Sequence, residues 1–464
     1  MAACRSGGLL APKLLNITEL TTSTKLSEKH LTRHFCKLLL YAVPSIRQGW
    51  FFGLEWMKFI LFLSVGKSGK GKSSFAILGV ANAFEKFLAD DAVFLSSTPL
   101  PVEGKSNFMK MFANTKSTVI WQPTGSLKDK SATSGYTYGL SKWIYPVADS
   151  LACSYYVYST NWIKDDAAQW KVTTDIGTEI SLKNYSIVSR NNFKISKKIN
   201  TAITKTVKDK QWVTVHFTFE SDRKGSVPAI IIKPNKKEIK AVVFYQHGMG
   251  EEYNKEYFLE EAKTLAENGI ASLVIDAPFK RKGDSFIESG GMKDAEIFEN
   301  NCVEWLQAID ILPAFNIPSK NIFFVGQSYG ARVAALMPYL DARFKKILIV
   351  SGIYNNAEWL QTTVVNQITE LRKAISPQDF KKYISTIAGY DASLYLNKKN
   401  DLEFYFQAGT NDETLSEYDI LSCYEMTNSK KRITWYNASH QLNKQAKVDR
   451  IEQIIKWANE NTSH

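Results

Sequence analysis

The stretch that decides the fold is the pentapeptide GQSYG at residues 326–330, which follows NIFFV at 321–325 and precedes ARVAALM at 331–337. The apolar run before it predicts a buried strand, and the run after it predicts a helix. Strand, G-x-S-x-G and helix together make a sharp turn that exposes the serine. A serine hydroxyl is a weak nucleophile unless a nearby base takes its proton. The pattern therefore predicts Ser328 as an activated nucleophile.

The base for Ser328 must come from the six histidines of the chain. In this kind of site the acid and then the histidine follow the serine in chain order. Only His440 and His464 follow it, and His464 is the last residue. His440 comes after a strand predicted at 432–436 and before a predicted C-terminal helix, so we predict it as the base. The alternative is a surface loop histidine.

The acid is expected in the loop after another strand, which is predicted at 402–408. Asp412 lies in that loop and is the candidate. Glu413 is its rival one position further on. The alternative for Asp412 is a role in capping the loop, because aspartate side chains often accept backbone N–H groups two or three residues ahead.

A developing oxyanion needs two backbone N–H groups. The strand predicted at 241–245 runs into QHGMG at 246–250, where glycines let the backbone turn its N–H groups toward the nucleophile. We expect the N–H of Tyr329, at the positive end of a helix, and a second N–H from this loop to face the oxyanion. His247 and Asp276 are predicted to be structural.

These motifs, in this order, resemble the α/β-hydrolase family over residues 210–464, and its dienelactone-hydrolase and acyl-esterase branches most. The resemblance implies a doubly wound, mostly parallel sheet. Carried over, it implies Ser328 as nucleophile, His440 as base and Asp412 as orienting acid. It also implies an oxyanion hole formed by the N–H groups of Met249 and Tyr329. It implies hydrolysis of an ester, thioester or amide of a small-molecule acyl substrate. No cofactor and no metal are implied, because these groups supply the chemistry themselves.

Residues 354–400 separate two predicted core strands and are longer than a crossover needs. We predict a helical lid there, because lids of this kind exclude water and shape substrate choice. Trp359 and Tyr383 are expected to contact the acyl group.

Residues 74–178 have a different character. Helices are predicted at 75–89 and 106–113, and strands at 90–95, 118–124, 134–145, 151–162 and 169–176. FLADDAVF at 87–94, PVEGK at 101–105, GYTYG at 135–139 and WKV at 170–172 resemble SnoaL-like, nuclear-transport-factor-2-like domains. The resemblance implies an α+β cone that binds a small molecule, forms a homodimer or occasionally catalyses. Asp90 and Asp91 are predicted to lie in a helix-end turn rather than in a site.

The segment before residue 74 has no clear domain signature. Its apolar run at 50–65 contains two charged residues and is short for a membrane span, so membrane association is not expected. A basic start and a short apolar run at 57–65 resemble a signal peptide, but no clear cleavage site follows, so a cytoplasmic and an exported protein both remain open. We hypothesise that the first 56 residues are not part of the working protein.

GKSGKGKS at 66–73 matches the P-loop pattern. The run is low in complexity, and no strand ending in a magnesium-binding aspartate follows it. A flexible linker is therefore favoured over a nucleotide site. We accordingly predict four segments: an extension with a Gly/Lys linker, a cone domain, a polar linker and a hydrolase domain, at 1–73, 74–178, 179–209 and 210–464. For 179–209 an edge extension of a sheet is the alternative to a linker.

Composition narrows the remaining possibilities. The chain has 464 residues, 44% of them hydrophobic, which is enough for two or three domains with sizeable cores. Most of the excess behind the net charge of +12 lies before residue 75, so a globally basic nucleic-acid binder is not predicted. The five cysteines are scattered, without a C-x-x-C pair, so neither a disulfide framework nor a zinc site is predicted.

Overall fold

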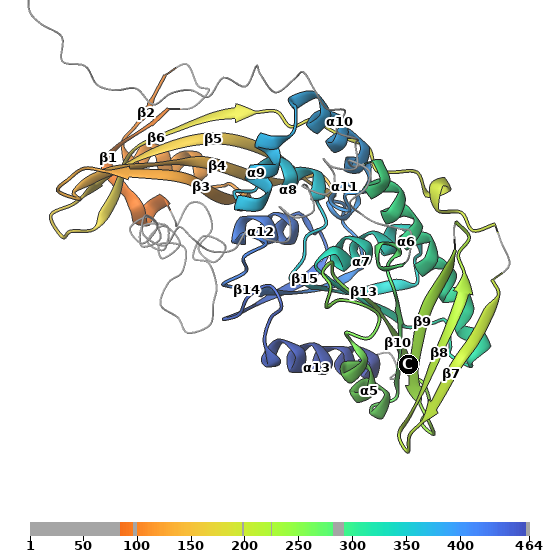
Figure 1. The fold of residues 1–464 in the computed structure, drawn as a ribbon. Coiled ribbons are helices and arrows are strands. Elements are labelled where there is room, and N and C mark those ends of the chain that lie inside the picture. Colours follow the sequence, from red (N-terminus) through yellow and green to blue (C-terminus); the bar gives the residue numbers. More distant parts are fainter. Residues whose placement is uncertain (1–83, 96–99, 197–198, 224, 282–291, 461–464) are drawn as a thin grey trace, which may run out of the picture. The chain divides into compact units, whose positions relative to one another are not determined.

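A computed structural model describes residues 84–95, 100–196, 199–223, 225–281 and 292–460 (Figure 1). All of them belong to one compact unit, Ile46–His464, whereas the unit Met1–Ser45 lies outside the described residues. The signal-like run at 57–65 and the P-loop-like run at 66–73 also lie outside them, so those interpretations stay predictions.

A nine-stranded mixed sheet forms the larger of two sheets (Figure 1). Its order is β15-β14-β13-β12-β10-β11-β9-β8-β7. Strands β10 to β15 pair in parallel, and β9, β8 and β7 continue the sheet antiparallel. The strands are β7 Thr201–Lys208, β8 Trp212–Glu220, β9 Ser226–Pro234, β10 Ala241–Gln246, β11 Ile270–Ile275, β12 Ile322–Gln327, β13 Phe344–Val350, β14 Glu403–Gly409 and β15 Lys430–Tyr436.

The central strands are buried along their whole length, which explains their apolar sequences. Every residue of β10, β11 and β12 is buried, as expected for parallel strands covered on both faces. The register pairs Gln246 with Gly326. The loop after β10 and the turn after β12 therefore leave the sheet at the same edge.

Helices cover both faces of this sheet (Figure 1). Helices α5 Leu259–Glu267 and α13 Lys444–Glu460 pack on one face. Helices α6 Met292–Ile311, α7 Tyr329–Leu340 and α12 Glu417–Met426 pack on the other. This layered arrangement is the doubly wound α/β class that was predicted.

The segment 179–209, predicted as a linker or an edge extension, contains an edge strand. Strand β6 extends to Ile180, and Thr201–Lys208 forms β7, the edge strand that pairs antiparallel with β8. All eight residues of β7 are exposed. Its lysines and threonines suit an exposed edge, because charged side chains discourage pairing with other chains. The sheet thus begins before residue 210.

The segment between β13 and β14 is helical, as predicted for a lid. It contains α8 Asn356–Thr362, α9 Asn366–Ala374, α10 Pro377–Ile387 and α11 Ser393–Leu396. Helices α8, α9 and α10 share a small apolar cluster of their own.

A six-stranded sheet of order β2-β1-β6-β5-β4-β3 precedes the larger sheet in sequence. Its strands are β1 Leu88–Leu95, β2 Val102–Glu103, β3 Thr118–Lys128, β4 Ser134–Val147, β5 Ser150–Lys164 and β6 Trp170–Ile180. Helix α4 Lys105–Phe112 packs on one face. The four long predicted strands and the second predicted helix are confirmed, with longer strand ends.

Strand β1 begins earlier than expected. Residues 84–87 are helical and β1 starts at Leu88, so Asp90 and Asp91 lie inside a strand and not in a helix-end turn. The pairing of β1 with β6 is irregular between Leu88 and Val93, and both aspartates are exposed there. This irregularity lets two adjacent acids occupy the strand without burial.

The other face of the six-stranded sheet contacts the helices that cover the nine-stranded sheet. Part of it packs on α12 through one apolar cluster, whose buried members are Ile120, Leu140, Ile144, Tyr155, Tyr418, Leu421 and Met426. The two sheets thus share buried surface within a single compact unit.

Candidate active site

Ser328 lies at the tip of the turn between β12 and α7. Its backbone has φ 51° and ψ −115°, a conformation that non-glycine residues rarely adopt. A Cβ on Gly326 would lie 2.1 Å from Gly330 O, and one on Gly330 would lie 2.2 Å from Gln246 O. Both positions therefore require glycine, and the predicted strand–turn–helix arrangement is confirmed.

The structure brings Ser328, His440 and Asp412 together in one hydrogen-bonded series. His440 Nε2 lies 2.9 Å from Ser328 Oγ, and Nδ1 lies 2.8 Å from Asp412 Oδ2. A carboxylate can only accept, so in the neutral ring Nδ1 carries the hydrogen and Nε2 presents its lone pair to the serine. The side chain of Asp412 is 1% exposed and that of His440 is 11% exposed. The three residues come from segments that follow β12, β14 and β15.

Backbone amides fix the orientation of Asp412. Its Oδ1 accepts the N–H groups of Thr414 at 2.8 Å and Leu415 at 2.9 Å. The capping role that was the alternative for Asp412 therefore coexists with its contact to His440. Glu413, its rival, is exposed and accepts the backbone N–H of His440 at 3.3 Å instead of contacting the ring. Sequence reasoning offered capping and contact with a histidine as alternatives for Asp412, whereas the structure shows both.

His247 is placed as a structural residue. Its Nδ1 lies 2.7 Å from Gly248 O, and Nε2 accepts the N–H of Ala277 at 3.1 Å. Burial lowers the pKa of His247 to about 4. The ring is therefore neutral at pH 7, and both nitrogens are engaged in holding two loops together. Asp276 is also structural, because it accepts both the backbone N–H and the ammonium of Lys255.

The loop after β10 passes directly against the nucleophile. A Cβ on Gly248 would lie 3.1 Å from Ser328 Cβ and 3.7 Å from its Oγ. The carbonyl of Gly248 points to His247, so the N–H of Met249, in the same trans peptide, points the opposite way. Gly250 has φ 124°, which explains its glycine. The oxyanion hole of Met249 and Tyr329 itself stays a prediction.

Further polar contacts around the turn were not anticipated. Gln327, next to Ser328, donates to the hydroxyls of Tyr253 at 3.4 Å and Tyr257 at 3.3 Å. From the lid, Tyr383 donates to Asp294 of α6 at 2.6 Å and so ties α10 to α6. The predicted acyl contacts of Tyr383 and Trp359 stay predictions.

The described residues contain neither a metal-binding cluster nor a membrane-spanning helix. In the part of the chain that the structure describes, no group of three or more His, Cys, Asp or Glu side chains is placed to hold a metal ion. Within the same ranges, no helix combines the length and apolarity needed to cross a bilayer. Cys153, Cys302 and Cys423 are free thiols.

No protein-family model matches the chain. No curated protein matches it either. Solved structures with a similar fold include acetyl xylan esterase 1 from a Thermoanaerobacterium species, at 16% identity and a TM-score of 0.46, covering 59% of this chain and 95% of that one. An acetyl xylan esterase from a Paenibacillus species is 14% identical with a TM-score of 0.47, covering 57% and 91% of the two chains. An S-formylglutathione hydrolase from Agrobacterium tumefaciens is 16% identical with a TM-score of 0.42, covering 56% and 99%.

These neighbours are esterases and a related hydrolase. At such identities and TM-scores, their activities and substrates do not carry over to this chain. The α/β-hydrolase resemblance of residues 210–464 rests on the strand order and the turn at Ser328 described above. The comparisons give no support to the SnoaL-like resemblance of residues 74–178.

Proposed function

We propose that the chain is a serine hydrolase that cleaves a carboxylic ester, or a related acyl bond, through an acyl-enzyme on Ser328. The observation that carries the proposal is the series Ser328 Oγ, His440 and Asp412, with contacts of 2.9 Å and 2.8 Å. The strained turn at Ser328 supports it, because such strain is typical of activated nucleophiles.

Each residue has one role in the proposed reaction. His440 Nε2 takes the proton of Ser328 while Oγ bonds to the carbonyl carbon. The oxygen of the resulting tetrahedral intermediate accepts the N–H groups of Met249 and Tyr329. His440 then gives its proton to the leaving alcohol as the carbon–oxygen bond breaks. Water, activated by the same histidine, later releases the acid. Asp412 keeps the ring oriented and stabilises its charged form.

Two other functions are compatible with the sequence. A peptidase or amidase uses the same three residues, and only the leaving group differs. A small-molecule binding module would instead use the SnoaL-like cone that residues 74–178 resemble, and a homodimer through that domain belongs to the same proposal. The hydrogen-bonded series favours a hydrolase over a binding module, because binding alone does not need it.

Turnover of p-nitrophenyl esters, from acetate to long acyl chains, tests the function. We expect Ser328→Ala to lower kcat by about 10⁴- to 10⁶-fold. The matched control is Ser385→Ala, which changes an exposed serine that bonds only to its own helix α10. Unchanged turnover in Ser328→Ala would refute the mechanism. Labelling of Ser328 by a fluorophosphonate without turnover of any ester would favour the amidase.

A further inference from the structure

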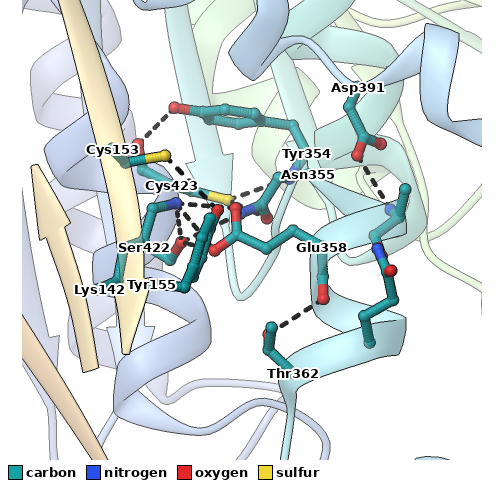
Figure 2. A network of polar contacts seen from close by, with 12 residues as sticks. Lys142, Cys153, Tyr155, Tyr354, Asn355, Glu358, Thr362, Asp391, Ser422 and Cys423 are labelled. Carbon is teal, nitrogen blue, oxygen red and sulfur yellow. Dashed lines mark hydrogen bonds and ion pairs between the residues drawn. The ribbon is translucent and has the colours of Figure 1, made fainter. Parts of the chain in front are cut away.

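A second polar cluster lies where the six-stranded sheet meets the hydrolase domain. Figure 2 shows Lys142 of β4 extending toward Glu358 of α8 and Ser422 of α12. Lys142 Nζ donates to the two carboxylate oxygens of Glu358 at 2.8 and 2.7 Å and to Ser422 Oγ at 2.7 Å. One side chain from the smaller sheet thus contacts two helices of the hydrolase domain.

The hydrolase side of the cluster is itself closely connected. Ser422 Oγ donates to Glu358 Oε1 at 2.6 Å, and Asn355 Nδ2 donates to Glu358 Oε2 at 2.8 Å (Figure 2). Cys423 Sγ in turn donates to Asn355 Oδ1 at 2.7 Å. Helix α8, its N-terminal loop and α12 are therefore joined through Glu358.

Lys142 and Glu358 form a charged pair. The Lys142 side chain is 1% exposed. Burial alone would lower the pKa of Lys142 and raise that of Glu358. The opposite charge of the partner and the hydrogen bonds of the cluster together outweigh burial, so the pKa of Lys142 is raised and that of Glu358 is lowered. A charged ammonium has no lone pair, so Lys142 is not a base for Ser422. Lys142 instead joins β4 to α8 and α12.

The two linked helices lead directly to the candidate site. Helix α12 begins after Ser416, immediately behind the loop in which Thr414 and Leu415 hold Asp412. Helix α8 follows β13, whose Val350 O accepts the N–H of Ser328 at 2.9 Å. The short connection between β13 and α8 also passes the nucleophile, because a Cβ on Gly352 would lie 3.0 Å from Ser328 O.

Other contacts join the six-stranded sheet to the same region. The Gln122 amide of β3, oriented so that both of its atoms are satisfied, donates to Thr362 O at 2.9 Å and accepts from Val364 N at 3.0 Å. At the far end of the lid, Lys399 N donates to Asp149 O at 2.7 Å. The sheet therefore contacts the lid near both of its ends.

We propose that Lys142 is a positioning residue, through which the six-stranded domain holds α8 and α12, and thereby Ser328 and Asp412, in the geometry that turnover requires. This proposal rests on the proposed hydrolase function. A displacement of about 1 Å at reacting groups can cost roughly 100-fold in rate, so a loosened support should appear in kcat.

The test compares the full-length Lys142→Met and Lys142→Met/Glu358→Gln variants with wild type. The single variant leaves Glu358 buried without its cation. The double variant removes the charge, while the amide still bonds to Ser422 and Asn355, so it remains folded even where the single variant does not. We expect kcat for p-nitrophenyl acetate to fall about tenfold or more in the single variant and at least about fivefold in the double variant, with KM within about twofold.

The matched control is Lys346→Met, which removes a lysine that bonds to Glu460 at 2.8 Å and, within the described residues, makes no hydrogen bond or ion pair to α8 or α12. It should lower thermal stability without lowering kcat. A folded double variant with wild-type kcat, whatever its thermal stability, would show that the pair plays no part in positioning the candidate site and would overturn the proposal. Wild-type protein that neither turns over esters nor is labelled at Ser328 by a fluorophosphonate would overturn the proposed function, and this proposal with it.

Discussion

The molecule contains two clusters built from the same kinds of groups: a serine, a side chain with a nitrogen at its end and a carboxylate. In one, Ser328 Oγ lies 2.9 Å from His440; in the other, Ser422 Oγ lies 2.7 Å from Lys142. Ser328 is half-buried on a turn at the edge of the sheet, whereas Ser422 is buried within α12. Although the residue types and distances are similar, we expect a nucleophile at Ser328 and a structural link at Ser422.

What separates the two clusters is the state of the nitrogen that faces the serine. Asp412 accepts a hydrogen bond from the Nδ1–H of His440, so the neutral ring presents a lone pair at Nε2. Glu358 keeps Lys142 charged, so the ammonium nitrogen has no lone pair and can only donate hydrogen bonds. The comparison teaches that access to solvent and a free lone pair, rather than composition, distinguish a candidate nucleophile site from a structural link.

The largest expected effect in this comparison comes from the carboxylate of the first cluster. Asp412→Asn should lower kcat by about 10⁴-fold, because an amide does not enforce the ring orientation that presents the Nε2 lone pair. The matched control is Glu413→Gln, which alters only a contact to the His440 backbone and should cost about tenfold or less. Steady-state kinetics on one p-nitrophenyl ester measures both. Equal losses in the two variants would leave the role of Asp412 unsupported.

The carboxylate of the second cluster should matter for stability instead. Lys142→Met should lower the free energy of unfolding by about 3–5 kcal/mol at pH 8, because it leaves Glu358 as an unpaired buried charge. Adding Glu358→Gln should recover most of that loss. Chemical denaturation followed by circular dichroism measures these differences, and a single variant as stable as wild type would contradict the charged-pair description.

The pH dependence of that loss has a defined sign. Without its cation, Glu358 should have a pKa above its unfolded value, because burial then dominates. A raised pKa gives stability that is present at low pH and is lost as the pH rises through the pKa of Glu358 in the folded variant. The free energy of unfolding of the variant should therefore be closer to that of wild type at pH 5 than at pH 8. The other titratable groups that act on Glu358 are Tyr155, Tyr354, Asp391, Tyr418, Asp419 and Cys423. These groups are present in both proteins. Subtracting the wild-type free energy of unfolding from that of the variant at each pH therefore cancels the parts of their contributions that the substitution does not change.

The smallest expected effect concerns His247, a histidine beside the nucleophile that is not its base. Its pKa is lowered to about 4 by burial, so its contribution to stability is complete above its unfolded pKa of about 6.5 and is lost as the pH falls toward 4. The loss amounts to about 3 kcal/mol. The stability difference between wild type and His247→Gln should shrink by that amount between pH 7.5 and 3.5. A difference independent of pH would mean that the ring is not buried as described.

The sequence predicted the candidate site well because each of its parts follows a local pattern. Ser328 follows from G-x-S-x-G between strand and helix, and His440 and Asp412 follow from chain order and strand ends. The structure brings the three together at the distances given above. Asp412 also has the capping role that its loop position left as the alternative, because it accepts two backbone amides as well as contacting His440.

The errors and omissions have physical causes as well. For residues 179–209 the sequence left a linker and an edge extension both open, because an edge strand such as β7, exposed along its whole length, lacks the alternation that marks a half-buried strand. No pattern in the sequence predicted the buried ion pair of Lys142. A lysine in a strand ordinarily faces water, and its partner Glu358 lies 216 residues away in the chain.

The shared apolar face between α12 and the six-stranded sheet limits how such a protein can be taken apart. A fragment that began after β6 would expose Tyr418, Leu421 and Met426 to water and leave Glu358 without its cation. Such a fragment should aggregate or refold poorly, because exposed apolar patches and unpaired buried charges both favour association. In evolutionary terms the two sheets are no longer interchangeable modules: recombination that exchanged one of them would have to carry over a matching lysine and a matching apolar surface.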